Sequence, residues 1–390
     1  MSSMLKAIGD LVSKCETWNP AYKGQDDFEY IDLSSVDKDA KVISATEVIP
    51  CSEAPSRARQ IVKEGDVLVS TVRPNLNGVA KVEGRHTGAT ASTGFCVLRP
   101  NPDSLDTNYL FHWVKSPAFI QRMVDVASGA NYPAVSDKKV KGSPIPVPPL
   151  EEQKRIAEIL DAADALRAKR RESLAQLESL LQSTFLDMFG DPASCESQWD
   201  RCVLGDVVEF AKDGPHVSPE YSEEGIPFLS ARHVRPGKII WEDLKHVSQE
   251  EAQRQWKKCR PQEGDILYTK GGTTGVAATV TTPEPFAIWV HVALLRPLTN
   301  LVHPMWLEAM LNTEYCYQQS QKYTHGIANR DLGLKRMVKI DMYLPPLELQ
   351  TRFVGVAKRI LRERQRYLDH LGELNSLFLS LQSRAFVGEA

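Results

Sequence analysis

Two polar stretches of the sequence gather side chains that can bind phosphate groups and the edges of nucleic-acid bases. The first stretch, SGANYPAVSDKKVKG, contributes Asn131, Tyr132, Lys138, Lys139 and Lys141. The second stretch, THGIANRDLGLKRM, contributes His325, Asn329, Arg330, Lys335 and Arg336. Lysine and arginine neutralise phosphates, whereas asparagine and arginine can form paired hydrogen bonds with base edges. Both stretches are therefore predicted to contact DNA.

Three further groups of polar residues extend this prediction. A turn after the strand-like run GDVLVSTV carries Arg73, Asn75 and Asn77. The turn after the similar run GDILYT carries Lys270, Thr273 and Thr274. A region rich in turns adds Lys212, His216, Arg232 and His233. Any one of these residues could simply lie in a solvated loop, but clusters at matching places in the chain favour DNA contact.

The sequence carries no recognisable catalytic or metal-binding signature beside these clusters. The segment NPAY at 19–22 differs from the D/N-P-P-Y/F element of amino methyltransferases at its third residue, and no glycine-rich cofactor loop accompanies it. The segment GGTTG at 271–275 lacks the Lys-Ser/Thr pair of a phosphate-binding P-loop. The nine histidines and seven cysteines show no paired ligand spacing. We expect a binding protein with no catalytic residue, no metal and no cofactor of its own.

Composition points to a soluble globular protein. Hydrophobic residues make up 42% of the 390 residues, charged residues make up 25%, and the net charge is −3. No apolar run is long enough for a membrane span, and the N-terminal segment does not resemble a signal peptide. An odd number of cysteines without a C-x-x-C pair is typical of reduced thiols, so we expect a cytoplasmic location.

An internal repeat organises the chain. The motif PPLEEQKR starts at 148 and PPLELQTR starts at 345, an offset of 197 residues. The tripeptide LRP occurs at 98 and at 295 with the same offset, and the two GD runs start at 65 and 264. Several matches in one order at nearly one offset indicate two copies of a unit of about 195 residues.

Each copy is predicted to have a globular part followed by a long helix. Short β-branched runs and a helical piece make up the globular part. The residues from 150 to 189 lack proline and glycine, and apolar or small side chains recur every three or four positions, beginning with Ile156, Ile159, Ala163 and Leu166. The second helix has a similar stripe, weakened by Gly355 and Gly372. We expect the two helices to pair with each other, although each could instead dock on its own globular part.

The Pro-Pro pair explains how each helix begins. Proline disfavours helix in the residue before it and fits the first helical turn, where its missing N–H costs nothing. Glu151, Glu152 and Glu348 suit the positive end of the helix dipole. The motif is therefore interpreted as a rigid joint. The predicted fold class is α+β, with globular parts at 1–147 and 191–344 and long helices at 148–190 and 345–390.

The layout resembles the specificity subunits of type I restriction-modification systems. The resemblance rests on the P-x-P-P-L-x-E-Q-x-R-I start of the first helix, its L-x-x-x-F-x-x-M-F-G end and the second PPLELQ helix, and it covers essentially the whole chain. It implies two target recognition domains joined by an antiparallel coiled coil, and a bipartite, asymmetric DNA site with an unspecific spacer. The second copy departs from the pattern at Leu349 and at 351–353, which affects only the second joint.

The same resemblance implies partners that carry the catalysis. Two methyltransferase subunits would dock on this chain, bring S-adenosylmethionine and methylate adenine N6. Two restriction-translocase subunits that use ATP and Mg²⁺ could join them. Two other interpretations remain open from the sequence: a scaffold that assembles proteins without binding DNA, and an enzyme that acts on DNA alone. Salt-dependent DNA binding would argue against the first, and an absence of methylation by the isolated chain would argue against the second.

Overall fold

The computed structural model describes residues 4–23, 27–129, 131–194, 199–326 and 330–387. The chain forms two compact units, each with its own hydrophobic core. Unit 1 combines residues 1–172 with 368–390, and unit 2 consists of residues 173–367. The globular part of unit 1, from β1 to β13 (Met4 to Val147), is called head 1, and that of unit 2, from β14 to β25 (Asp200 to Leu344), is called head 2.

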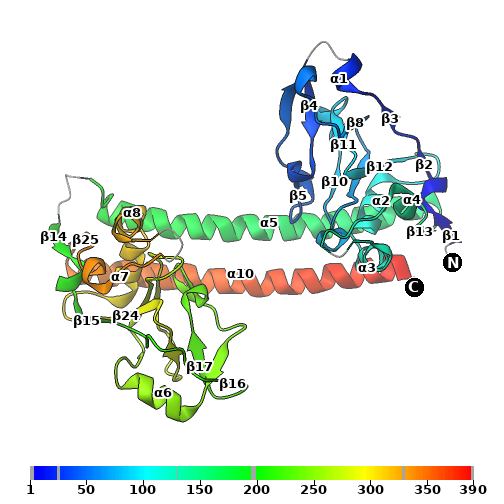
Figure 1. Ribbon diagram of the computed structural model, residues 1–390. Helices are drawn as coiled ribbons and strands as arrows, with labels where there is room; N and C mark the ends of the chain where they lie inside the picture. Colours follow the sequence, from blue (N-terminus) through cyan, green and yellow to red (C-terminus); the bar gives the residue numbers. More distant parts are fainter. Residues whose placement is uncertain (1–3, 24–26, 130, 195–198, 327–329, 388–390) are drawn as a thin grey trace. The chain divides into compact units, whose positions relative to one another are not determined.

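Head 1 contains two main sheets (Figure 1). The four-stranded sheet has the order β10 (Val79–Lys81), β9 (Val67–Ser70), β12 (Phe95–Pro100), β2 (Val12–Ser13). The five-stranded sheet has the order β3 (Glu16–Thr17), β8 (Ala58–Ile61), β11 (Thr90–Ser92), β4 (Asp27–Ile31), β7 (Glu47–Pro50), in which only the β11–β4 pair is parallel. Two small pairs join β1 (Met4–Ala7) to β13 (Pro144–Val147) and β5 (Val36–Asp37) to β6 (Val42–Ile43). The helices are α1 (Pro20–Lys23), α2 (Thr107–Val114), α3 (Pro117–Val126) and α4 (Asp137–Lys141).

Head 2 repeats this plan with different details. Its first four-stranded sheet has the order β15 (Val208–Asp213), β24 (Val292–Pro297), β21 (Ile266–Thr269), β22 (Ala277–Thr279). Its second has the order β16 (Tyr221–Ser222), β20 (Lys245–Val247), β17 (Ile226–Leu229), β23 (Ala287–Ile288). Two small pairs join β14 (Asp200–Val203) to β25 (Asp341–Leu344) and β18 (Val234–Arg235) to β19 (Lys238–Ile239). The helices are α6 (Gln249–Trp256), α7 (Pro304–Leu311), α8 (Glu314–Tyr323) and α9 (Leu334–Met337).

In each head, the aspartate of the GD run and the arginine of the LRP tripeptide form an ion pair whose carboxylate is buried. Arg99 donates from Nε and Nη2 to the two oxygens of Asp66, at 2.8 and 2.7 Å. Arg296 donates in the same way to Asp265, at 2.8 Å for both bonds. The two carboxylates are only 1% and 2% exposed. A bidentate pair of this kind fixes β9 to β12 and β21 to β24, so the matching motifs form the same structural contact in both heads.

The single helical piece predicted in each copy is a pair of short helices. In head 1, α2 ends at Val114 and Ser116 caps α3, because its Oγ accepts from the Phe119 N–H at 3.2 Å. In head 2, Thr313 caps α8 by accepting from the Cys316 N–H at 3.4 Å. A side chain that caps a new helix offers the backbone an alternative to continuing the old one, which explains both breaks.

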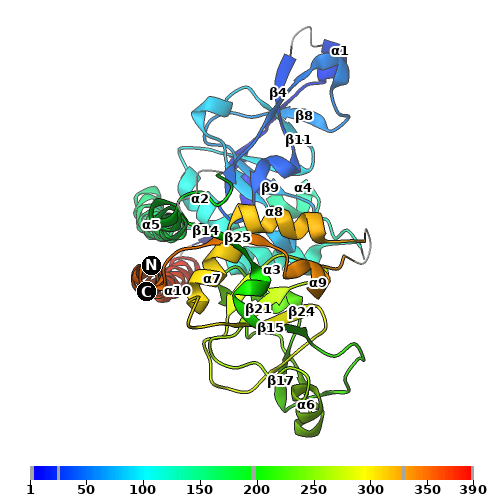
Figure 2. The same cartoon turned by 90° about the vertical axis from the view of Figure 1, so that its left-hand side faces the viewer.

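The long helices are α5 (Leu150–Phe189) and α10 (Leu347–Val387), and within each unit their segments pair in antiparallel fashion (Figure 1, Figure 2). Within unit 1, the start of α5 shares a core with the end of α10, and Arg167 Nε donates to Asn375 Oδ1 at 2.8 Å. Within unit 2, Phe185 near the end of α5 lies 5.4 Å from Phe353 near the start of α10, measured between ring centroids. The predicted α+β fold with a coiled coil is therefore confirmed.

Each long helix packs through its start on the head that precedes it, as in the alternative interpretation, and through its end on the head of the other copy. Phe386 of α10 lies against Tyr109 and Trp113 of head 1, with ring centroids 5.2 and 5.1 Å apart. Phe189 of α5 lies against Trp306 of head 2 at 5.9 Å. Only part of the predicted apolar stripe of α5 is buried, because the helix packs through a face that is rotated slightly from the predicted one. Ile156, Leu160 and Ala163 are buried, whereas Ile159 and Leu166 are 39% and 54% exposed.

A buried glutamine completes the joint between each head and its helix. Gln153 Nε2 donates to the carbonyls of Ser104 and Pro148, both at 3.0 Å, and its Oε1 accepts from the Asp106 N–H at 2.9 Å. Gln350 makes the same three bonds in head 2, to Leu301, Pro345 and His303. The glutamines are 1% and 0% exposed. In each head, one side-chain amide thus forms hydrogen bonds with an N–H and a carbonyl of the loop before α2 or α7, and with the carbonyl of the proline that precedes the long helix.

We predict that Gln153→Ala lowers the free energy of unfolding by about 2–4 kcal/mol, because one backbone N–H and two carbonyls lose their buried partner. Chemical denaturation of the chain measures this change. The control is Lys154→Ala on the next, exposed position of α5, which is expected to change stability by less than about 0.5 kcal/mol. Equal effects of the two substitutions would contradict the role assigned to the glutamine.

Candidate nucleic-acid interface

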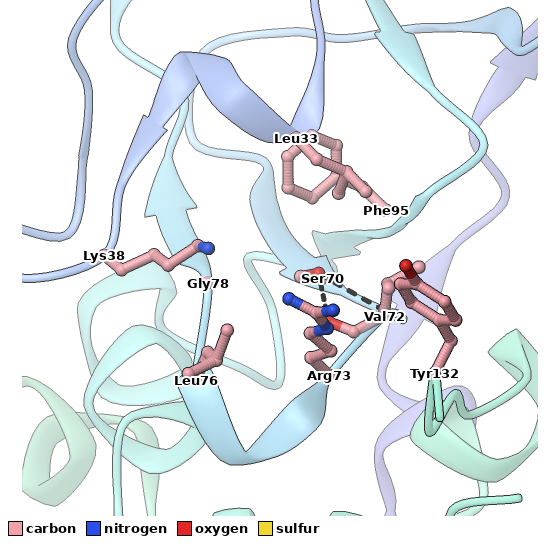
Figure 3. Close-up of a pocket in the computed structure, with 9 residues that line it drawn as sticks. All are labelled: Leu33, Lys38, Ser70, Val72, Arg73, Leu76, Gly78, Phe95 and Tyr132. Carbon is pink, nitrogen blue, oxygen red and sulfur yellow. Dashed lines mark hydrogen bonds between the residues drawn. The ribbon is translucent and has the colours of Figure 1, made fainter. Parts of the chain in front are cut away.

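In head 1 the structure brings together two of the polar segments predicted to bind DNA. The turn after β9 carries Arg73 and the short 3₁₀ turn Pro74–Leu76, and it lies against the segment around Tyr132 (Figure 3). The Arg73 N–H donates to the Pro133 carbonyl at 2.7 Å, and the Val135 N–H donates to the Thr71 carbonyl at 2.8 Å. The roughly sixty residues that separate these partners along the chain make the pairing invisible to local sequence patterns.

In head 2 the corresponding two segments are joined by equivalent backbone hydrogen bonds between different residues; this pair of joined segments is called the framework of each head. The Gly272 N–H donates to the Arg330 carbonyl at 3.2 Å, and the Leu332 N–H donates to the Lys270 carbonyl at 2.7 Å. Bridges join Gly271 to Asp331 in head 2 and Val72 to Ala134 in head 1. The backbone that presents the two polar segments is therefore common to both heads, while the side chains that it presents differ.

In head 1 these segments border a hollow of about 260 Å³. Arg73 and Tyr132 form one side, with the guanidinium carbon 4.9 Å from the centre of the phenol ring, and Tyr132 is 69% exposed. Leu33 and Phe95 form an apolar wall, and Lys38 faces the hollow from the opposite side (Figure 3). The arrangement offers apolar, aromatic and cationic groups to a flat polar ligand, such as the edge of a base.

The remaining head 1 residues are sequence neighbours of residues that line this hollow or lie on α4. Asn75 and Asn131 are exposed, and Asn77 is half-buried with its carbonyl accepting from Lys41 Nζ at 2.6 Å. Burial lowers the pKa of Lys41 from its usual value. On α4, which Ser136 caps, Lys138 and Lys139 are exposed and Lys141 is half-buried. Lys139 Nζ donates to the Val126 carbonyl, which holds this lysine beside the end of α3.

Most of the predicted head 2 residues are also at the surface. Lys212 Nζ lies 4.5 Å from the centre of the Phe210 ring, and His216 Nε2 lies 3.2 Å from Asp213 Oδ2. The members that are exposed or half-buried at the surface are Lys212, His216, Arg232, Thr273, His325, Arg330 and Lys335. Arg336 is half-buried and donates from Nε to the Tyr323 carbonyl at 2.8 Å. Asn329 lies outside the described residues.

Three predicted residues are buried, and each has partners within the protein. Lys270 is 5% exposed, with Nζ 2.9 Å from Asp331 Oδ1 and 3.4 Å from Asp213 Oδ2. Thr274 is 1% exposed, and its Oγ1 lies 3.0 Å from that of Thr324. His233 is 4% exposed and accepts at Nδ1 from the Ser230 N–H at 2.9 Å.

These partners argue against DNA contact by Lys270, Thr274 and His233. Burial, together with the charge of Arg232, lowers the pKa of His233 and favours its neutral form, which is a poor partner for phosphate. Lys270 compensates the buried Asp213 carboxylate, whose pKa is lowered by the nearby lysines against the opposing effect of burial. Residue type alone could not separate such internal lysines and histidines from surface ones, because burial is decided by distant segments.

Sequence reasoning missed Lys38, Leu33 and Phe95, which border the hollow. Leu33 and Lys38 precede the Arg73 turn by more than thirty residues and lie outside the sequence matches that define the repeat, so no spacing signal marks them. Among the described residues, no group of three or more histidine, cysteine or acidic side chains is placed to hold a metal ion. Nor does the described part of the chain contain a helix that is long and apolar enough to cross a membrane.

Comparison with known proteins identifies similar sequences. The family model of the type I restriction modification DNA specificity domain matches residues 39–179 and again residues 196–363. The type I restriction enzyme MjaVIII specificity subunit of Methanocaldococcus jannaschii is 23% identical over 332 residues, covering 80% of this chain and 74% of that protein. The EcoKI specificity subunit of Escherichia coli K12 is 23% identical over 357 residues, covering 85% and 76%.

Solved structures agree with this similarity. A chain from work on complex assembly and conformational transition of a type I R-M system is 25% identical, with a TM-score of 0.61 over 98% of this chain and 97% of that one. The type I restriction-modification S subunit from M. genitalium has the same fold, with a TM-score of 0.56 over 98% and 96% of the chains at 15% identity.

We predict that Lys270→Met destabilises unit 2 by about 2 kcal/mol, because Asp213 and Asp331 lose a charged hydrogen-bond partner. Thermal unfolding monitored by tryptophan fluorescence measures the change. The matched control, Lys335→Met, alters a surface lysine of the same head and is expected to leave the midpoint within about 1 °C. If Lys270→Met left stability unchanged and weakened DNA binding instead, the structural role of Lys270 would be wrong.

Proposed function

The chain belongs to the family of type I restriction modification DNA specificity proteins, and from this premise we propose that its two heads read the two parts of a bipartite DNA site. In this family the specificity subunit recognises DNA sequence and does not carry the catalysis. The double match of the family model assigns one specificity domain to each copy of the repeat. Head 1 and head 2 are thus the two target recognition domains.

The proposal depends on one observation: the two heads share the same backbone framework but present different side chains on it. Both heads bridge the turn after the GD strand to the polar segment before the long helix. Head 1 presents Arg73 and Tyr132 there, whereas head 2 presents Thr273, His325 and Arg330. Base recognition depends on which donors and acceptors face the groove, so the two half-sites are expected to differ in sequence. Lysines that flank the framework would bind phosphates without regard to sequence.

The two long helices are proposed to set the spacing between the half-sites. Each helix begins in one unit and continues without interruption into the other. A paired helix has a fixed rise per residue, so the number of residues between the joints determines a length. DNA bases opposite the helices would be read by neither head and would form the unspecific spacer.

Partners are proposed to supply all of the catalysis. The named relatives are specificity subunits of type I restriction enzymes, so this chain is expected to work with methyltransferase and restriction subunits. We propose two methyltransferase subunits, which carry S-adenosylmethionine, and two restriction-translocase subunits, which use ATP and Mg²⁺. The isolated chain should then bind DNA without methylating it. A cytoplasmic location is proposed on the basis of the unpaired cysteine spacing.

We predict that replacing Lys138, Lys139 and Lys141 together by glutamine lowers affinity for all duplexes to a similar extent, since phosphates are common to every DNA sequence. Fluorescence anisotropy at several salt concentrations measures the change. The slope of log affinity against log salt should become shallower by roughly 0.9 for each phosphate that the variant no longer binds. Lys154→Gln, on the exposed face of α5, is the control. Unchanged affinity and slope at moderate salt would remove these lysines from the interface.

Shortening the helix pair tests the spacing role. Deleting one heptad from each helix, at 168–174 in α5 and 366–372 in α10, keeps the apolar faces in register. Seven residues correspond to roughly 10 Å of helix, or about three base pairs of DNA. Selection from duplexes with spacers of every length should therefore favour a site about three base pairs shorter. An unchanged spacer in a folded variant would show that the helices do not set it.

A further inference from the structure

We propose that Arg73 is a base-reading residue of head 1 that recognises a guanine in the first half-site, and that Tyr132 is the residue that positions its guanidinium. The inference rests on the proposed function, because it takes head 1 to be a DNA reader. It goes beyond that function by assigning one base type to one side chain. Four observations support it: the backbone at Arg73, its counterpart in head 2, the absence of another partner for its guanidinium among the described residues, and the hollow beside it.

The backbone of Arg73 is left-handed, with φ 50° and ψ 63°. A residue with a Cβ atom rarely adopts this conformation, because the Cβ approaches its own carbonyl oxygen, whereas glycine adopts it without cost. The turn requires this geometry, since the Arg73 N–H must reach the Pro133 carbonyl at 2.7 Å while its carbonyl accepts from the Leu76 N–H at 2.9 Å. Folding alone would therefore favour glycine at position 73.

Head 2 has glycine at the corresponding position. Gly272 has φ 70°, and its N–H donates to the Arg330 carbonyl as the Arg73 N–H donates to the Pro133 carbonyl. A Cβ placed on Gly272 would meet nothing within 4 Å, so the site is open in that head. The same turn thus contains glycine in head 2 and an arginine with strained backbone in head 1. Backbone strain of this kind clusters at functional sites, where the side chain has a role besides folding.

The guanidinium of Arg73 has no other task among the described residues. Arg99, in the same head, donates twice to Asp66. Arg73 forms no ion pair and no side-chain hydrogen bond with the part of the chain that the structure describes, and its guanidinium instead lies 4.9 Å from the centre of the Tyr132 ring. Stacking on an aromatic face restricts the orientation of a guanidinium and leaves its donors free at the edge.

The donors of Arg73 match the major-groove edge of guanine. Guanine presents two acceptors side by side, O6 and N7, and a paired hydrogen bond from arginine is the commonest specific contact to it. A phosphate would also accept from arginine, but a phosphate contact needs neither the stacked ring nor the fixed backbone. Across the hollow, Lys38 supplies a positive charge suited to a phosphate of the same DNA segment, and Leu33 and Phe95 exclude water from this wall (Figure 3).

The test compares Arg73→Gly, Arg73→Lys and the unaltered 390-residue chain. Each protein selects duplexes from a pool with random sequence in both half-sites, and the bound duplexes are sequenced. Every guanine of the enriched first half-site is then replaced singly by 7-deazaguanine, which lacks the N7 acceptor, and dissociation constants are measured. Arg122→Gln serves as the control, because Arg122 is an exposed arginine of the same head on α3.

The unaltered chain should lose affinity at one position when 7-deazaguanine replaces guanine, and Arg73→Gly should be insensitive to that replacement. Preference for guanine at that position should fall by roughly tenfold or more in both Arg73 variants, with preferences elsewhere retained. Arg73→Gly should unfold at the same or a higher temperature, which excludes misfolding as the cause. Tyr132→Leu should reduce the same preference to a smaller extent.

Two results would overturn the inference. Intact guanine preference in Arg73→Gly would show that Arg73 reads no base, and an equal loss of affinity for every duplex would show a phosphate contact. Both results would leave the proposed function standing. If the unaltered chain enriched no sequence at all in either half-site, the proposed function itself would fail, and this inference with it.

Discussion

The structure depends on the way in which each head is fastened to a long helix. A proline pair ends the last strand of the head, and three residues into the helix a buried glutamine bonds to the preceding proline carbonyl and to the loop before α2 or α7. An amide has both donors and an acceptor, so it can satisfy backbone groups of both kinds at one buried point. The helix therefore leaves the head in one direction, and a recognition surface on the head keeps a constant relation to the first turns of that helix.

The two heads share the contacts that hold the backbone and differ in the side chains that face solvent. The buried pairs of Asp66 with Arg99 and of Asp265 with Arg296 are equivalent, as are the bridges between turn and polar segment. The side chains on those segments have diverged, from Arg73 and Tyr132 in head 1 to Thr273 and His325 in head 2. A protein that must recognise two different short sequences with one architecture needs this division between fixed framework and variable surface.

The sequence predicted the repeat, the fold class and the long helices, because those features leave periodic or duplicated signals. It predicted less about individual side chains. The importance of Gln153 was missed, since an identical glutamine in two copies does not reveal which backbone groups it satisfies. Lys270 and His233 resemble phosphate ligands in sequence but are buried, because residues such as Asp213 and Ser230 approach them in the folded head. Local patterns determine elements, whereas burial and partners are set by contacts between distant segments.

The central claim is that one chain reads two unlike DNA segments through two related heads. The sequence of duplexes enriched by this chain from a fully random pool tests it most directly. The account predicts two short blocks of different sequence, separated by a constant number of positions without base preference. A single continuous block, or two identical blocks, would contradict it.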